Sequence, residues 1–118
     1  MFRFEELEIW QLAIDYAKAI YQLVEKFPKV EMFALSDQIR RAVVSISNNI
    51  AEGSGGTDRD FANYLDIAAK STLETVNCLH LAREFGYINE SVERDFYGRA
   101  ELLVKKIRAL KRSFTRKP

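Results

Sequence analysis

Helix-breaking residues occur at only a few places in this sequence, and their positions constrain the fold more than any other feature. The two prolines are Pro28 and Pro118, and the five glycines are Gly53, Gly55, Gly56, Gly86 and Gly98. Between most of these breaks, apolar residues recur every three or four positions, with almost none of the alternation that β-strands show. The sequence therefore predicts an all-α protein with four long helices.

Residues 38–53 form the predicted central helix. Its apolar residues fall on one stripe at helical spacing, and they are Ile39, Ala42, Val43, Ile46 and Ile50. The residues beside that stripe are small or polar, which allows other helices to approach closely. We expect Ser36 to cap the first turn and Gly53 to take the left-handed conformation that ends many helices.

Three more helices are predicted around the central one. The first spans about residues 4–26, the third spans residues 57–86 with Thr57 at its start, and the fourth begins at Asn89 or Ser91. Helices of this length with short connections form an antiparallel up-down-up-down four-helix bundle. We expect residues 1–118 to be one such domain with a basic C-terminal tail.

The first and third predicted helices each carry two apolar seams. In the first helix, one seam contains Leu7, Trp10, Ile14, Ala17, Tyr21 and Val24, and the other contains Ile9, Ala13, Tyr16, Ile20, Leu23 and Phe27. One seam is sufficient inside a bundle, and large apolar patches are unusual on monomers. We therefore predict a homo-oligomer. The longest connection, residues 28–35, is expected to pack across one end of the bundle.

The composition argues against several kinds of chemistry. The single cysteine, Cys78, cannot form an intrachain disulfide, and with the single histidine, His80, it cannot build a zinc site. Two residues apart on a helix, these side chains point in different directions, so we expect Cys78 in the core and His80 at the surface. Residues 53–56 read as a turn because the lysine of a phosphate-binding loop is missing. We predict no enzyme, cofactor or metal.

Acidic residues punctuate the N-terminal segment, where a secretory signal would have to be apolar. They are Glu5, Glu6, Glu8 and Asp15. The chain also lacks an apolar run of the length that spans a membrane. We expect a cytoplasmic protein with no membrane contact.

The formal net charge of +1 hides an uneven distribution. Residues 1–101 contain all 17 acidic residues, whereas residues 102–118 contain no acid. The basic residues of that tail are the candidate nucleic-acid-binding residues: Lys105, Lys106, Arg108, Lys111, Arg112, Arg116 and Lys117. Attraction to phosphate is strong and insensitive to sequence, and an oligomer would repeat the cluster. Alternatively, the tail only solubilises the helix end or pairs with the acidic body of a neighbouring subunit.

Glu74 falls on a mostly apolar seam of the third predicted helix. A buried carboxylate needs a partner, so we expect an ion pair with Arg40 or Arg41 of the central helix. The alternative places Glu74 in water at the rim of the bundle.

Three segments carry a family resemblance: EELEIWQLA, FPKVEMFALSDQIRRAVVSISNNIAEGSG and FANYLDIAAKSTLE. They resemble the small bacterial four-helix-bundle family that includes proteins encoded in intervening sequences of large-subunit ribosomal RNA genes. The residues that follow the family pattern are Gln38, Arg40, Arg41, Ala42, Ser45, Ile46, Asn49, Ile50, Ala51, Glu52 and Gly53. Relatives include the accessory variability protein of diversity-generating retroelements, a homopentamer that binds nucleic acid and the reverse transcriptase.

The resemblance implies a homopentamer and no enzymatic activity. With the basic tail, it leads to the hypothesis of a homopentameric scaffold that binds structured nucleic acid or a nucleoprotein. Its partners would be further copies of itself, RNA or DNA, and a nucleic-acid-processing protein. The alternative is a protein-binding or purely structural helical assembly with no nucleic-acid role.

Overall fold

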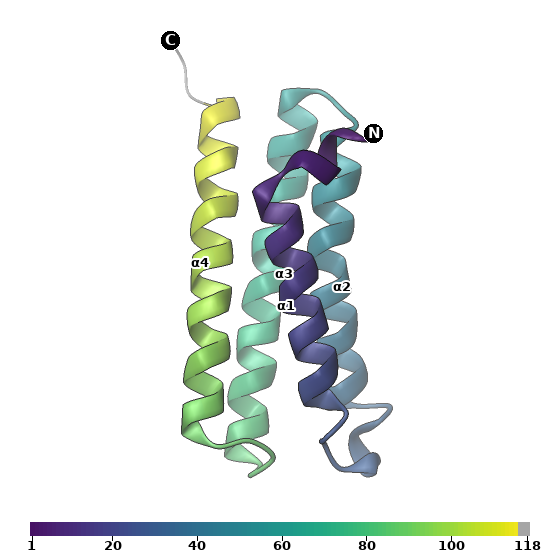
Figure 1. Ribbon diagram of the computed structural model, residues 1–118, viewed down its shortest axis with the longest axis vertical. Helices are drawn as coiled ribbons and strands as arrows, with labels where there is room; N and C mark the ends of the chain where they lie inside the picture. Colours follow the sequence, from purple (N-terminus) through teal and green to yellow (C-terminus); the bar gives the residue numbers. More distant parts are fainter. Residues whose placement is uncertain (116–118) are drawn as a thin grey trace.

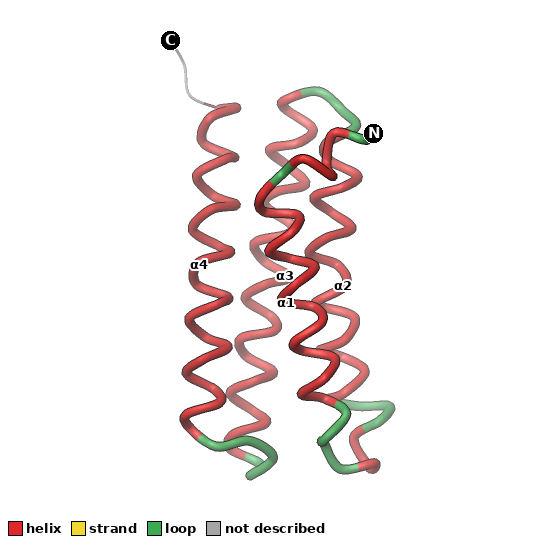
Figure 2. The backbone as a smooth tube through the Cα atoms, viewed as in Figure 1, coloured by secondary structure: helices red, strands yellow, loops and turns green. Residues whose placement is uncertain are grey.

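The computed structural model describes residues 1–115 of the 118-residue chain. Its four long helices are α1 (Glu8–Val24), α2 (Leu35–Ser54), α3 (Asp58–Glu84) and α4 (Glu90–Thr115). Two short 3-10 helices, η1 (Arg3–Glu6) and η2 (Lys29–Glu31), precede and follow α1. The long helices lie side by side in a body of 49 × 24 × 20 Å (Figure 1), and residues 1–115 contain no strand (Figure 2). The all-α helical prediction is confirmed.

The four helices enclose a core of aliphatic and aromatic side chains. The predicted stripe of α2 lies in this core, where Ile39, Val43, Ile46 and Ile50 are fully buried. The contacts of α3 with α2 and with α4 are the most extensive, whereas the seam between α1 and α4 is sparsely packed. None of the helices in residues 1–115 is long and apolar enough to cross a membrane.

The starts of α2 and α3 differ in how their first backbone amides are satisfied. Thr57 caps α3 as predicted: its hydroxyl accepts a hydrogen bond from the Asp60 amide at 3.1 Å, and the Asp60 carboxylate accepts one from the Thr57 amide at 3.2 Å. The cap predicted at Ser36 is wrong, because Ser36 is buried inside α2. The Glu31 carboxylate of η2 instead accepts a hydrogen bond from the Leu35 amide at 3.3 Å.

Gly53 lies inside α2 rather than after it, so the prediction of a left-handed helix end at this residue is wrong. A Cβ atom at Gly53 would lie 2.5 Å from Tyr64 Cβ and 2.9 Å from Phe61 Cδ1 of α3. Glycine is therefore required for the close approach of the two helices. In residues 1–115, only Gly86 after α3 has a positive φ, at 82°.

The seam of α1 that contains Trp10 is covered within one chain, except at Tyr21. Trp10 is half-buried, and the ring of Phe4 from η1 packs against it with a centroid distance of 5.2 Å. More apolar surface stays exposed on α3, at Ile67 and Leu73, and at Phe85 directly after it. The surplus apolar surface was predicted on both α1 and α3, and it lies mainly on α3.

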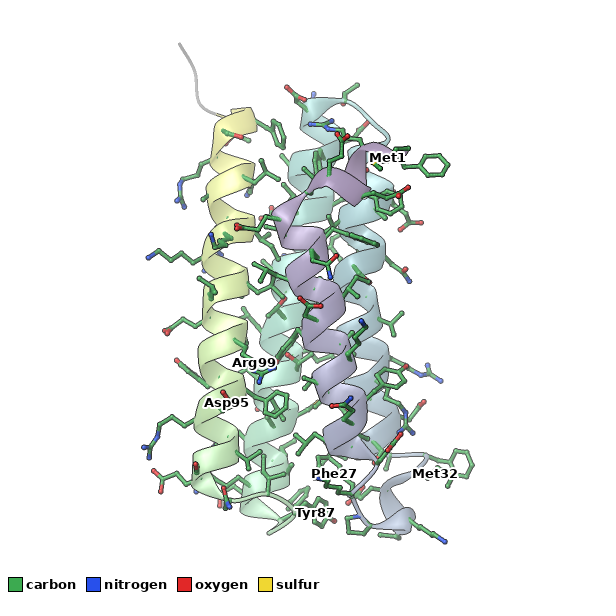
Figure 3. All side chains as sticks on the ribbon, in the orientation of Figure 1. Met1, Phe27, Met32, Tyr87, Asp95 and Arg99 are labelled. Atoms are coloured by element: carbon green, nitrogen blue, oxygen red, sulfur yellow. The ribbon has the colours of Figure 1, made fainter. Side chains whose placement is uncertain are left out.

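The connection between α1 and α2 is anchored at one point and exposed elsewhere. The Tyr87 hydroxyl donates a 2.6 Å hydrogen bond to the Glu31 carboxylate, and the rings of Tyr87 and Phe27 lie 5.6 Å apart, at the lower end of the bundle in Figure 3. However, Val30 is 83% exposed and Phe33 is 89% exposed. The prediction that this apolar segment packs across the bundle end is therefore wrong for Val30 and Phe33.

Candidate nucleic-acid interface

The basic residues predicted to bind nucleic acid belong to the C-terminal part of α4. The structure describes five of them, and Arg116 and Lys117 lie outside the described residues. The core side of this part of α4 is held by Leu103 and Ile107, which are almost fully buried. Because a helix turns by 100° per residue, the five cations cannot share one environment.

Two of the five cations are tied to neighbouring helices. Lys106 Nζ lies 2.8 Å from a carboxylate oxygen of Glu8 at the start of α1. Lys111 Nζ lies 2.8 Å from a carboxylate oxygen of Asp66 on α3. All four side chains remain at least a third exposed, and ion pairs of this kind contribute about 0–1 kcal/mol. These two ion pairs connect the C-terminal part of α4 to α1 and to α3, but they hold Lys106 and Lys111 only weakly.

The other three cations form what we call the cationic stripe: Lys105, Arg108 and Arg112. All three are exposed, and none lies within 4.0 Å of an acidic oxygen in the described chain. Their spacing of three and four residues places them on one side of α4, over about 10 Å of helix axis. The charge of these three residues is therefore available to an external anion.

Lys70 of α3 extends the positive surface, and sequence reasoning missed it. It follows Asp66 by four residues and precedes Leu73 by three, so it lies on the same side of α3 as both. Because Asp66 meets Lys111, that side of α3 borders α4. Lys70 is exposed and has no ion pair among the described residues. Lys70 is recognised as part of this surface only once α3 and α4 are packed against each other. No local sequence signal could therefore have identified it.

Arg99 of α4 is excluded from this surface. It pairs with Asp95 at 3.3 Å and lies over the Phe96 ring at 5.3 Å from the centroid. Figure 3 shows Arg99 and Asp95 on the side of α4 toward α1. The available positive charge therefore lies on the side of α4 away from α1.

Cys78 and Tyr16 lie in the core, as expected for Cys78. Burial raises the pKa of the Cys78 thiol to about 11. Burial also raises the pKa of Tyr16 to about 12, although a 2.8 Å hydrogen bond with the Thr75 hydroxyl works in the opposite direction. Both groups therefore stay protonated at neutral pH, so Cys78 lacks the thiolate character of a reactive cysteine.

His80 lies at the surface, as predicted, within a cluster of charged groups that joins α3 to α4. Its Nδ1 lies 3.0 Å from a Glu93 carboxylate oxygen, and its Nε2 lies 3.4 Å from one of Glu84. Arg83 pairs with both carboxylates. In residues 1–115, no group of three or more potential ligand side chains is arranged to hold a metal ion.

The ion pair predicted for Glu74 is replaced by other contacts. Arg41 pairs with Asp37 on its own helix at 2.9 Å, and Arg40 donates a hydrogen bond to the Met32 carbonyl oxygen at 3.4 Å. The Gln38 amide lies 3.5 Å from the Glu74 carboxylate. Glu74 is exposed, so water solvates it and no buried charge demands an arginine.

Together these features define a small all-α bundle protein with an exposed cationic surface at one helix end. The chain belongs to the 23S rRNA-intervening sequence protein family, whose model matches residues 5–109. A similar solved structure is that of a protein with unknown function from the S23 ribosomal protein family of Bacteroides thetaiotaomicron VPI-5482. It is 25% identical, covers 88% of this chain and 95% of its own, and superposes with a TM-score of 0.81. A search of the curated proteins found no significant match.

Proposed function

We propose that this chain is the subunit of a non-enzymatic homo-oligomeric scaffold that binds structured nucleic acid or a nucleoprotein through the cationic stripe. The family resemblance supports a pentamer. The proposed subunit is a single antiparallel up-down-up-down domain of residues 1–118. Two contacts support opposite directions for α3 and α4: Lys111 meets Asp66 near one end, and His80 meets Glu93 near the other.

The availability of Lys105, Arg108 and Arg112 is the observation that carries this proposal. These three cations have no acidic partner in the described chain, so their charge is free to meet an anion from outside it. Phosphate groups attract such residues regardless of base sequence, with an affinity that falls steeply as salt is raised. We expect contacts mainly to phosphates and little base specificity.

Exposed apolar side chains support self-association. Val30, Phe33 and Phe85 lie at the end of the bundle where α1 meets α2 and α3 meets α4, and all are more than half exposed. This end is opposite the C-terminus of α4 (Figure 1). Covering this surface with further copies would leave the cationic stripe free and would repeat it once per subunit.

The test is a binding titration with a fluorescently labelled RNA hairpin and a DNA hairpin at 50 and 200 mM salt. We expect binding at 50 mM that weakens at least tenfold at 200 mM. The variant Lys105→Gln/Arg108→Gln/Arg112→Gln should bind at least tenfold more weakly at 50 mM and depend less on salt.

The matched control is Lys18→Gln/Lys26→Gln/Lys29→Gln, which removes the same charge from exposed positions outside α4. It should bind within about threefold of the unchanged protein. No binding to either hairpin at 50 mM salt would refute the nucleic-acid role. Equal losses in the two triple variants would show that net charge matters rather than the stripe.

The second candidate function is a protein-binding assembly with no nucleic-acid role. The 89% exposure of Phe33 beside Val30 favours it, because that apolar surface suits a protein partner better than an anion. In this case the hairpins would not bind, and the cationic stripe would only keep the protein soluble.

A further inference from the structure

A shallow apolar groove runs between α3 and α4 on the surface of the bundle. Its volume is about 220 Å³, and it is lined by Leu73, Val76, Tyr97, Ala100, Glu101 and Val104. Tyr97 lines the groove and is 51% exposed, so about half of the side chain is open to solvent. The groove is smaller than the pockets of about 300–1,000 Å³ that take drug-sized ligands, and it suits a single flat ring.

The groove leads directly into the positive surface. Tyr97, Glu101, Val104 and Arg108 follow one another at spacings of four, three and four residues, so they lie along one face of α4. Across the groove, Lys70 lies one turn from Leu73 on α3. Arg108 and Lys70 therefore each lie about one turn beyond the lining residues Val104 and Leu73, toward the C-terminus of α4.

We propose that the groove and the cationic stripe form one site for single-stranded nucleic acid, in which an unstacked base lies on the Tyr97 ring. The stripe residues Lys105 and Arg108, together with Lys70 of α3, hold the phosphates that lie between that base and the C-terminus of α4. This assignment rests on the proposed function and narrows its ligand to the unpaired segments of a structured nucleic acid, such as loops. Combining a basic track with an aromatic platform is how proteins bind single strands without reading their sequence.

The surroundings of Tyr97 favour a base over a phosphate at this point. Leu73, Val76 and Val104 offer no hydrogen-bond donor to an anion, and the exposed Glu101 carboxylate repels one. Along α4, the basic residues of this site come after Glu101, and the first of them is Lys105. The bases of a duplex are stacked on each other, so a duplex could use the cations but could not place a base on Tyr97.

Binding of two labelled probes tests the proposal: a 12-nucleotide oligouridine and a 12-base-pair RNA duplex, both at 50 mM salt. Tyr97→Leu keeps an apolar side chain at a half-exposed position but removes the ring. We expect it to weaken oligouridine binding about 5- to 150-fold, the range for loss of one base stack, and to leave duplex binding within about twofold. Tyr97→Phe retains the ring and should bind oligouridine as the unchanged protein does.

An oligonucleotide with one 2-aminopurine gives a direct readout of stacking. Its fluorescence should be quenched on binding to the unchanged protein and to Tyr97→Phe, but not on binding to Tyr97→Leu. Unchanged oligouridine affinity in Tyr97→Leu, or an equal loss for both probes, would overturn the single-strand site.

Failure of this inference can be separated from failure of the proposed function. If the stripe variant weakens binding of both probes while Tyr97→Leu behaves as the unchanged protein, the stripe binds phosphate and the base site is wrong. If the unchanged protein binds neither probe at 50 mM salt, both the single-strand site and the proposed function are wrong.

Discussion

At Gly53, α2 and α3 lie so close together that a single methyl group would not fit. An added Cβ would meet Tyr64 Cβ at 2.5 Å and Phe61 Cδ1 at 2.9 Å. Both neighbours are held by helix α3, so one of the helices would have to move. We expect Gly53→Ala to lower the free energy of unfolding by about 1–3 kcal/mol in urea denaturation, despite the better helix propensity of alanine.

Gly98 provides the matched control within α4. A Cβ at Gly98 would meet no atom within 4 Å. Gly98→Ala should therefore stabilise the protein by about 0.5–1 kcal/mol through helix propensity alone. If both substitutions changed stability in the same direction, close packing at Gly53 would not be the cause.

At the scale of the elements, the junction of α3 and α4 depends on Glu93. Burial works to raise the pKa of this carboxyl, but hydrogen bonds from His80 and Arg83, with the charges of both groups, hold it below its ordinary value. A lowered pKa in the folded state means that the contribution to stability is present above the pKa of the unfolded chain. It is lost as the pH falls through the lower, folded value.

Replacing Glu93 with Gln should therefore destabilise the protein near neutral pH and matter little in acid. We expect a thermal midpoint about 3–6 °C lower at pH 7, equivalent to about 1 kcal/mol, and a difference that shrinks between pH 5 and pH 2.5. Glu90→Gln is the control, because Glu90 and its partner Arg94 are mostly exposed. A pH-independent difference for Glu93→Gln would contradict the electrostatic explanation.

The helices themselves could largely be predicted from the sequence, because their signals are local. The spacing of Ile46 and Ile50 reports which side of α2 is buried, and Thr57 carries its own capping partner three residues away. The start of α2 could not be predicted in the same way. Its first amide is satisfied by Glu31 from another element, and Ser36 lies in the core instead.

The candidate site was only partly predictable, because the availability of a cation depends on residues far away in the chain. The sequence identifies the basic cluster, but Lys111 meets Asp66 across 45 positions and Lys106 meets Glu8 from the opposite end of the chain. The same holds for Tyr97, whose groove exists only because α3 supplies Leu73 and Val76.

At the scale of the whole molecule, the proposed homopentamer predicts the mass of the native complex. Native mass spectrometry should give five times the 13.7 kDa of one chain, and a lone 13.7 kDa species at micromolar concentration would contradict the assembly. Val30→Ser/Phe33→Ser should shift the distribution toward smaller species with little effect on helix content, since both side chains are exposed in the single chain. Leu102→Ser, at an exposed apolar position on α4, is the control and should leave the mass unchanged.

The bridge from Lys106 to Glu8 crosses the most sparsely packed seam of the bundle. Glu8 opens α1, so this single contact helps to keep the first turn of that helix in place. A phosphate that draws Lys106 toward itself would share the ammonium group with Glu8 or displace that carboxylate, so the two anions compete for this lysine. Ionic strength weakens each of these exposed attractions, so the salt that releases a polyanion also loosens the first turn of α1.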